Sequence, residues 1–342
     1  MKWHDALVTD VTTEDPGERA IVPWVWYSIR GRFNAAIRRR HRYRVLHDAY
    51  DIFLVDGMKN RAAVAGGDQL HQQLGCIFFA DCSFLLSQDL GQLPIAAILI
   101  DGIHIDEHVI LIALGIDEGG TKHVLGLWEG ATEHHKVCLS LLNNLVRRNL
   151  DVQRSTLFVI DGSGALRKAI RTVFGDYAIV QRCQVHKVAN VRDHLPKEMH
   201  DSVRKAMRDA YQASSVAAAK TRLLALAKQL ANEHPGAAAS LREGLDETLT
   251  VKGIGLTTSL ERTLSTTNPI ENLNGGVRDI SRRVKRWRGG SMILRWVAAA
   301  ALERQKSFRR LRGYKGMPAF IAFLRRNDAA LNSDVDQVTD VA

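Results

Sequence analysis

Two aspartates stand beside long apolar runs in the central part of the sequence. Asp101 interrupts the run AILIDGIHI, and Asp161 ends the run TLFVIDG. An ionised carboxylate next to a buried strand is costly unless something pairs with it. Mg²⁺ is a suitable partner, because it prefers hard oxygen ligands and is held by one or two carboxylates plus substrate phosphates. Two such ions about 4 Å apart can activate the attacking oxygen and stabilise the leaving oxygen of a phosphodiester.

An Asp-Gly pair after a strand is also ordinary turn chemistry. Asp56, in the run IFLVDG, has the same local context, and for one such Asp taken alone the turn is the commoner explanation. A functional role for Asp101 and Asp161 is favoured by their place on the first and fourth strands of the predicted sheet. We expect those two strands to lie side by side, whereas Asp56 precedes the sheet and has no such partner.

A third carboxylate, Glu271, lies at the start of a predicted helix. Asn268 is the predicted N-cap, with Pro269 at the first helical position. Glu271 then occupies the third position, where it can also form a capping box. An apolar stripe at three- and four-residue steps predicts that the helix continues to Trp287. The polar face of the predicted helix becomes increasingly cationic along Asn274, Arg278, Arg282 and Lys285. Such a face suits a nuclease site from which the DNA backbone continues along the same helix.

The elements around the aspartates predict an α/β fold. Apolar runs predict strands at 95–100, 109–116 and 123–128, which form an antiparallel meander with a Gly-Gly turn between the last two. A helix from Thr132 to about Asn149 follows, then a strand at 156–160, a helix from Ser163 and a strand at 177–180. This order predicts an RNase H-like catalytic core, in which a mixed sheet is flanked by helices and the first and fourth strands lie side by side.

The rest of the chain is predicted to be helical. Residues 1–90 form a divergent, loosely helical N-terminal region, and residues 91–195 form the first part of the core. An Ala-rich, all-helical insertion is expected at 196–264, interrupted at Pro235-Gly236. Residues 265–318 hold the Glu271 helix and basic C-terminal helices, and residues 319–342 form a C-terminal tail.

Positive charge is concentrated in two blocks. The 342 residues carry a formal net charge of +10, from 47 Lys and Arg against 37 Asp and Glu. Residues 281–315 contain twelve Lys or Arg and one acid, and residues 28–44 contain seven Arg and no acid. A solvated helix face usually interleaves acids with its basic residues, so this clustering favours a nucleic-acid partner. The stretch around Arg38–Arg42 suits phosphate contacts without sequence preference.

Composition excludes several other classes of protein. Apolar residues make up 46% and charged residues 25% of the chain, which is typical of a soluble globular protein. No apolar run approaches the roughly 20 residues of a membrane-spanning helix, and the N-terminus lacks the pattern of a secretory signal. Four cysteines in so long a chain do not make a disulfide framework. We therefore expect a cytoplasmic protein associated with the nucleoid.

Four long motifs, in order, resemble the mutator-type transposases of prokaryotic insertion sequences. In chain order, the four motifs start with these residues: ILIDGIHIDEHVILIALGIDEGG, LFVIDGSGALRKAI, QRCQVHKVANV and TNPIENLNGGVRDISRRVKRWRGG. The resemblance covers roughly residues 93–314. It implies an RNase H-like catalytic domain whose acidic triad falls on Asp101, Asp161 and Glu271, with a helical insertion before the Glu. It also implies Mg²⁺, with Mn²⁺ as a substitute, and a homo-oligomer on transposon-end and target DNA.

The family's Cys-x-x-His signature falls on Cys183 and His186. A structural zinc normally takes four ligands, and no second Cys/His pair of suitable spacing follows, so a metal is not expected at this pair. Packing behind the acidic site is the favoured role, because free Cys is commonly a small buried hydrophobe. A contact from His186 to phosphate is the alternative.

Two hypotheses about function follow. The first is a DDE transposase that cleaves transposon ends and transfers the freed strand, with DNA held by a basic segment: Arg278, Arg282, Arg283, Lys285, Arg286 and Arg288. The second is a catalytically inactive or truncated relic that only binds DNA. Residues 1 to about 85 do not match the end-recognition modules of the family, so recognition of the transposon ends is the least supported part of the first hypothesis.

Overall fold

The structure is a computed structural model that describes residue 85 and residues 87–130, 134–282, 284 and 286–339. The chain divides into two units, residues 1–75 and 76–342, and every described residue belongs to the second. The Arg-rich block at 28–44 and almost all of the predicted N-terminal region therefore lie outside the described residues. No helix in the described ranges is long and apolar enough to cross a bilayer.

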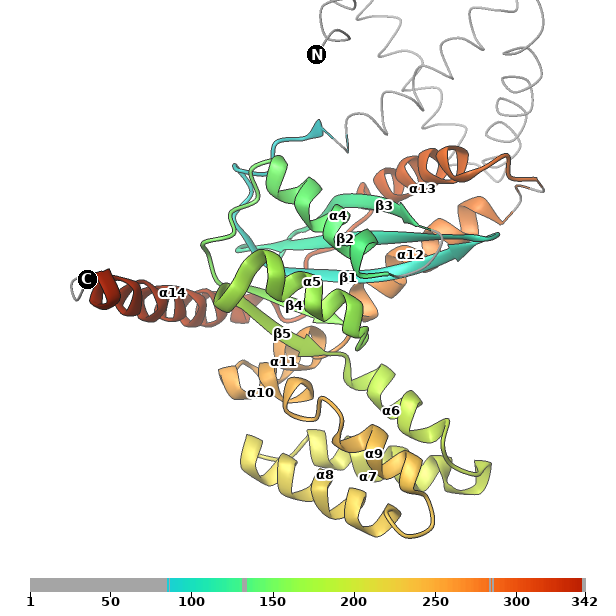
Figure 1. Cartoon of the computed structure of the whole chain (residues 1–342), viewed down its shortest axis with the longest axis vertical. Helices are drawn as coiled ribbons and strands as arrows, with labels where there is room; N and C mark the ends of the chain where they lie inside the picture. Colours follow the sequence, from blue (N-terminus) through green and yellow to red (C-terminus); the bar gives the residue numbers. More distant parts are fainter. Residues whose placement is uncertain (1–84, 86, 131–133, 283, 285, 340–342) are drawn as a thin grey trace, which may run out of the picture. The chain divides into compact units, whose positions relative to one another are not determined.

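A five-stranded mixed sheet forms the centre of the described unit (Figure 1). Its strands are β1 (Ile95–Ile105), β2 (His108–Asp117), β3 (Lys122–Gly130), β4 (Thr156–Ile160) and β5 (Ala178–Arg182). The spatial order is β3-β2-β1-β4-β5. The first three strands pair antiparallel, while β1 with β4 and β4 with β5 pair parallel. The predicted meander and the pairing of the first and fourth strands are both present.

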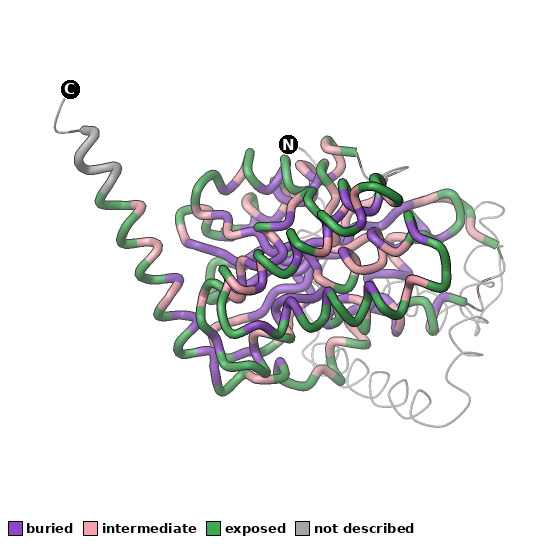
Figure 2. Tube along the Cα trace, turned by 90° about the horizontal axis from the view of Figure 1, so that it is seen from below, coloured by how far each residue is buried: buried purple, intermediate pink, exposed green. Residues whose placement is uncertain are grey.

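Alternate residues of each strand enter two separate cores, as the two-residue period of a strand requires. Ile98, Ile100 and Phe158 face one core, which is closed by α4 (His135–Arg147) and α5 (Gly164–Phe174). Leu99 and Val159 face the other. That second core is closed mainly by α12 (Asn268–Ser281), α13 (Gly290–Gln305) and the start of α14 (Met317–Thr339). Figure 2 shows the buried residues concentrated in these layers.

The segment between β5 and α12 is helical and has a core of its own. It contains α6 (Gln184–Arg192), α7 (His200–Tyr211), α8 (Val216–Leu230), α9 (Pro235–Arg242), α10 (Thr250–Ile254) and α11 (Thr258–Leu264). Buried residues from Val191 to Leu249 form one cluster that is separate from both cores of the sheet. Val251, Leu260 and Leu264 instead join the core beneath α12. The helical segment therefore has two parts. Residues 191–249 pack on one another, and the residues from Val251 to Leu264 pack in the core beneath the sheet.

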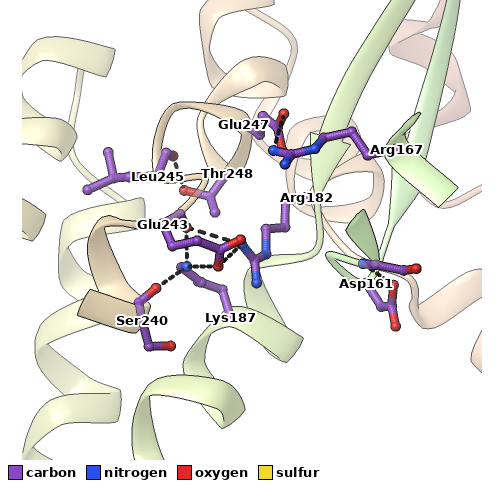
Figure 3. Close-up of polar contacts among 10 residues, drawn as sticks. Asp161, Arg167, Arg182, Lys187, Ser240, Glu243, Leu245, Glu247 and Thr248 are labelled. Atoms are coloured by element: carbon purple, nitrogen blue, oxygen red, sulfur yellow. Dashed lines mark hydrogen bonds and ion pairs between the residues drawn. The ribbon is translucent and has the colours of Figure 1, made fainter. Parts of the chain in front are cut away.

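A polar cluster fixes the helical segment to the end of β5 (Figure 3). The Lys187 side chain is fully buried, and its Nζ donates to the carbonyl oxygens of Ser240 and Glu243 at the end of α9. Arg182, 5% exposed, donates to the carbonyl of Glu243 at 3.1 Å and to its carboxylate. Burial is the main cause that lowers the pKa of Lys187, to about 8. These contacts connect the strand end next to Asp161 with the C-terminal end of α9.

Several predicted boundaries were wrong. β1 does not stop at Ile100 but continues through Asp101 and Gly102 to Ile105, and the chain turns at Asp106, whose φ is +54°. Helix α4 begins at His135 rather than at Thr132, which lies outside the described residues. Residues 319–339 belong to α14 rather than to a separate tail.

The Glu271 helix also differs from the prediction at both ends. Its N-cap is Thr267 rather than Asn268, and the helix ends at Ser281 rather than at Trp287. Arg282 is the C-cap, and Arg286 and Arg288 lie in the connection to α13. Like charges at three- and four-residue spacing destabilise a helix. This repulsion explains why the Glu271 helix ends where the cationic run begins. The predicted cationic helical face is therefore wrong beyond Arg278, because Arg282 is already the C-cap; Lys285 lies outside the described residues.

Candidate active site

The strand pairing places Asp101 and Asp161 next to each other. In the parallel pair of β1 and β4, Leu99 lies opposite Val159. The aspartates follow two residues later, Asp101 within β1 and Asp161 directly after the end of β4. Both continue the alternation that points Leu99 and Val159 toward the core beneath α12. Asp101 and Asp161 therefore lie on the same face of the sheet, and it is the face that α12 covers.

Asp101 is held inside a strand rather than in a turn. It pairs with Ile112 of β2, so the turn explanation for this Asp-Gly pair was wrong. Its carboxylate accepts a hydrogen bond of 2.8 Å from Nδ2 of Asn274 on α12. Burial is the main cause that raises the pKa of Asp101, and the negative charges of Asp161 and Glu271 raise it further. Burial and neighbouring negative charges both disfavour the ionised carboxylate, and a bound cation would offset both effects.

Asp161 combines a turn with its position beside Asp101. Its Oδ1 accepts the backbone N–H of Ser163 at 2.9 Å, and Ser163 is the N-cap of α5, as predicted. Gly162 between them has φ +117°, and a Cβ at this position would meet the guanidinium of Arg182. Glycine is therefore required where the chain leaves β4 with the Asp161 carboxylate held at the strand end.

Glu271 reaches the site from the first turn of α12, which contacts β1 (Figure 1). The predicted capping box is not what holds it, because its Oε1 accepts the Thr267 hydroxyl at 2.5 Å. The side chain is 39% exposed. Ile270 and Leu273 on either side of it are buried in the core beneath the sheet. Packing of the helix thus fixes the backbone of Glu271, and Thr267 fixes its carboxylate.

Cys183 and His186 lie beside Glu271, on the N-cap and in the first turn of α6. The Thr267 hydroxyl lies 3.2 Å from Cys183 Sγ and 3.2 Å from His186 Nδ1, and His186 Nδ1 lies 3.8 Å from Glu271 Oε1. The hydrogen bond with Cys183 is the main cause that raises the pKa of His186 to about 9. Burial opposes ionisation of the Cys183 thiol, but its hydrogen bonds with His186 and Thr267 lower its pKa overall. Cys183 is fully buried.

The predicted DNA-binding residues form no single helical face. Arg278 is exposed near the end of α12, and Arg282, Arg286 and Arg288 are exposed beyond that helix. Arg283 and Lys285 lie outside the described residues. The positive charge lies on the chain that leaves α12, starting two to three turns from Glu271.

Two residues that contact the acids were missed as site residues. Asn274 was assigned to a cationic polar face, yet it is fully buried and bonded to Asp101. A signal was available, because Asn274 lies four residues after Ile270 and three before Val277, inside the apolar stripe. Thr267 had no comparable signal, since its role depends on a contact with α6, more than 80 residues earlier in the chain.

Comparisons with known proteins agree on one family. The family model described as Transposase, Mutator family, matches residues 97–310. The chain is 29% identical over 225 residues to the transposase of insertion sequence element IS6120 from Mycolicibacterium smegmatis, covering 63% of this chain and 68% of that protein. It is 28% identical over 208 residues to the transposase of element ISRM5 from Rhizobium meliloti, covering 61% and 51%.

The match extends over all three acids and the Cys183–His186 pair. The chain spans about half to two thirds of the length of these two relatives. The matched residues 97–310 make up more than half of the chain, and the chain belongs to the Mutator family of transposases.

Proposed function

We propose that the protein is an RNase H-like DDE transposase of an insertion sequence, which cleaves DNA strands at the element's ends and transfers them to a target. The order of elements and the pairing of the first and fourth strands support the RNase H-like fold. The observation that carries the proposal is the placement of Asp101, Asp161 and Glu271 on one face of the sheet, where their charges act on one another.

The donor set fits Mg²⁺, with Mn²⁺ as a substitute, because all three side chains offer hard carboxylate oxygens. Asp101 and Asp161 would hold the metal from the sheet, and Glu271 would hold it from α12. Metal bound there supplies Lewis-acid activation of the attacking oxygen and stabilisation of the leaving oxygen. Strand cleavage by water and strand transfer by a 3′-hydroxyl are both in-line displacements at phosphorus, so one set of carboxylates serves both.

The chain's own residues orient the carboxylates. Asn274 donates to Asp101, the Ser163 N–H donates to Asp161 and Thr267 donates to Glu271. Each acid is thus oriented by a hydrogen bond from a neighbour. Such positioning matters because catalysis depends on holding reacting groups in a narrow range of geometries.

Asp161→Asn tests the catalytic assignment. We expect the variant to bind end-sequence DNA at least as tightly as wild type, because a negative charge is removed, while Mg²⁺-dependent strand cleavage is lost. Asp279→Asn is the matched control, since Asp279 is an exposed residue of α12 and its loss changes the net charge equally. Cleavage that survives in Asp161→Asn refutes the triad. Wild-type protein that binds DNA but never cleaves it supports the relic hypothesis instead.

We propose that the basic segment after α12 binds the DNA backbone. Each phosphate contact adds about 0.9 to the magnitude of the slope of log K against log salt concentration, so neutralising five such residues should flatten the slope by about 4.5. The variant replaces Arg282, Arg283, Lys285, Arg286 and Arg288 by Gln. An unchanged slope would show that DNA is bound elsewhere. Assembly as a homo-oligomer on DNA and association with the nucleoid stay predictions.

A further inference from the structure

Three possible metal ligands from two distant parts of the chain converge beside the acidic triad. Cys183 and His186 come from the start of α6, and Glu271 comes from α12. One ligand atom of each lies within 4.8 Å of the others. The sequence supplied only two members of this group, because Glu271 follows His186 by 85 positions and only folding brings it there.

The spacing is close to that of a bound zinc ion. Ligand atoms at about 2.0–2.3 Å from a tetrahedral zinc are roughly 3.3–3.8 Å apart. His186 Nδ1 and Glu271 Oε1 already lie 3.8 Å apart. The widest separation, 4.8 Å, has to shorten by about an ångström, which side-chain rotation can supply since His186 and Glu271 are 37% and 39% exposed.

The donor atoms differ in kind from those of the triad. One sulfur, one imidazole nitrogen and one carboxylate oxygen suit Zn²⁺ or Co²⁺, whereas three carboxylates suit Mg²⁺. Three protein ligands leave a fourth position for water, as in catalytic rather than structural zinc sites. This arrangement differs from the four-ligand structural site that the sequence argued against.

Thr267 holds the three donors together without a metal. Its hydroxyl oxygen contacts Cys183 Sγ, His186 Nδ1 and Glu271 Oε1 at 3.2, 3.2 and 2.5 Å. Its backbone N–H also donates to the sulfur at 3.4 Å. On metal binding the hydroxyl must rotate away from the centre of the group, while the N–H···S contact can persist. Such contacts around a ligand orient it and tune the metal.

We propose that Cys183, His186 and Glu271 form an exchangeable site for a borderline-soft divalent cation such as Zn²⁺. Binding replaces the thiol proton and the Nδ1 proton, which are released to solvent. Because Glu271 belongs to both sites, Zn²⁺ bound there competes with the Mg²⁺ of the proposed transposase function. The competition rests on that proposed function, but the site itself does not.

Cobalt binding to the full-length, metal-free protein tests the site. Thiolate bound to Co²⁺ produces a charge-transfer absorption band, which reports the ligand directly and needs no DNA. The test protein carries Cys76→Ser, Cys82→Ser and Cys138→Ser, so that Cys183 is the single thiol. We expect the band to appear at one equivalent of Co²⁺ and to be displaced by Zn²⁺.

Two further variants assign the ligands. Cys183→Ser in the same background should abolish the band, and His186→Gln should weaken Co²⁺ binding more than about tenfold, because even outer-shell partners cost 10–100-fold. His186 is half-exposed, so its variant should keep the wild-type thermal unfolding midpoint. A folded protein that gives no band with Cys183 present overturns the site, as does a band of unchanged affinity in His186→Gln.

Competition at Glu271 is tested separately. If both sites exist, raising Mg²⁺ should shift the Co²⁺ titration to higher concentration, and micromolar Zn²⁺ should inhibit cleavage less in Cys183→Ser than in wild type, each relative to its own uninhibited rate. A cobalt band together with an Asp161→Asn protein that still cleaves supports the soft-metal site and refutes the triad. Loss of cleavage in Asp161→Asn without any cobalt band supports the triad and refutes the soft-metal site.

Discussion

Asn274 offers a sharp test of how the acidic site is held. It is fully buried on α12, its Nδ2 donates to Asp101 at 2.8 Å, and its Oδ1 has no hydrogen-bond partner among the described residues. Asn274→Ala therefore removes one favourable contact and one unfavourable group at the same time. Its effects on stability and on activity should differ.

The magnitudes follow from these two atoms. A hydrogen bond to a charged group contributes about 1.5–3 kcal/mol, and a buried unpaired polar atom costs about 1–3 kcal/mol. The two terms offset each other in the free energy of unfolding, so we expect Asn274→Ala to lie within about 1.5 kcal/mol of wild type. If the bond orients Asp101 for catalysis, its loss slows cleavage about 10- to 150-fold, at about 1.4 kcal/mol for each factor of ten.

The assay combines thermal unfolding with strand cleavage at several Mg²⁺ concentrations. A misplaced Asp101 should raise the Mg²⁺ concentration needed for half-maximal cleavage, and excess Mg²⁺ should restore part of the rate. Asn272→Ala is the matched control, because Asn272 is an exposed neighbour on the same helix. Asn274→Ala that cleaves as fast as the control, with the same Mg²⁺ requirement, would refute a positioning role.

Three further outcomes test other parts of the structure. Asp101→Asn should raise the unfolding temperature at pH 7 by about 2–4 °C for each kcal/mol of relieved desolvation and repulsion; because the folded-state pKa of Asp101 is raised above its unfolded value, the gain should fade as the pH falls through the folded-state pKa and should be lost below the unfolded value of about 3.9. Lys187→Met should lower the free energy of unfolding by about 1–3 kcal/mol, measured in urea, since the carbonyl of Ser240 loses its buried donor and that of Glu243 keeps only Arg182; an unchanged midpoint would contradict the anchoring role. Gly162→Ala should destabilise by more than Gly175→Ala in the same titration, because both glycines have positive φ but only the first would meet a side chain.

The sheet could be predicted because its strands are continuous apolar runs. TLFVI is β4 without any change of boundary, and a fully buried strand has no other way to satisfy its backbone than neighbouring strands. The error at β1 has the same origin. Asp101-Gly102 has the composition of a turn, but Gly102 pairs with Leu111 and the turn lies at Asp106. Local turn preference was overridden by a sheet in which the carboxylate has partners.

The environment of Glu271 could not be predicted, because it consists of contacts between segments distant in the chain. The apolar stripe correctly indicated that α12 packs on a core, but periodicity does not report which element it meets or where it stops. Thr267 precedes the predicted N-cap Asn268, and nothing in the sequence indicates that its hydroxyl contacts α6. Charge composition predicted a DNA partner without distinguishing a cationic helix face from the connection that follows the helix.

One short stretch of α12 connects all the parts of the site. Thr267, Glu271 and Asn274 succeed one another at four- and three-residue steps, so they share a helical face. That face meets α6 at its first member and β1 at its last. The position of Glu271 relative to the two aspartates is consequently set by side-chain contacts of a helix, whereas the aspartates are positioned by backbone pairing of strands. Backbone pairing leaves little freedom to shift, so a change in metal occupancy or in DNA contact should move the Glu271 end of the site first.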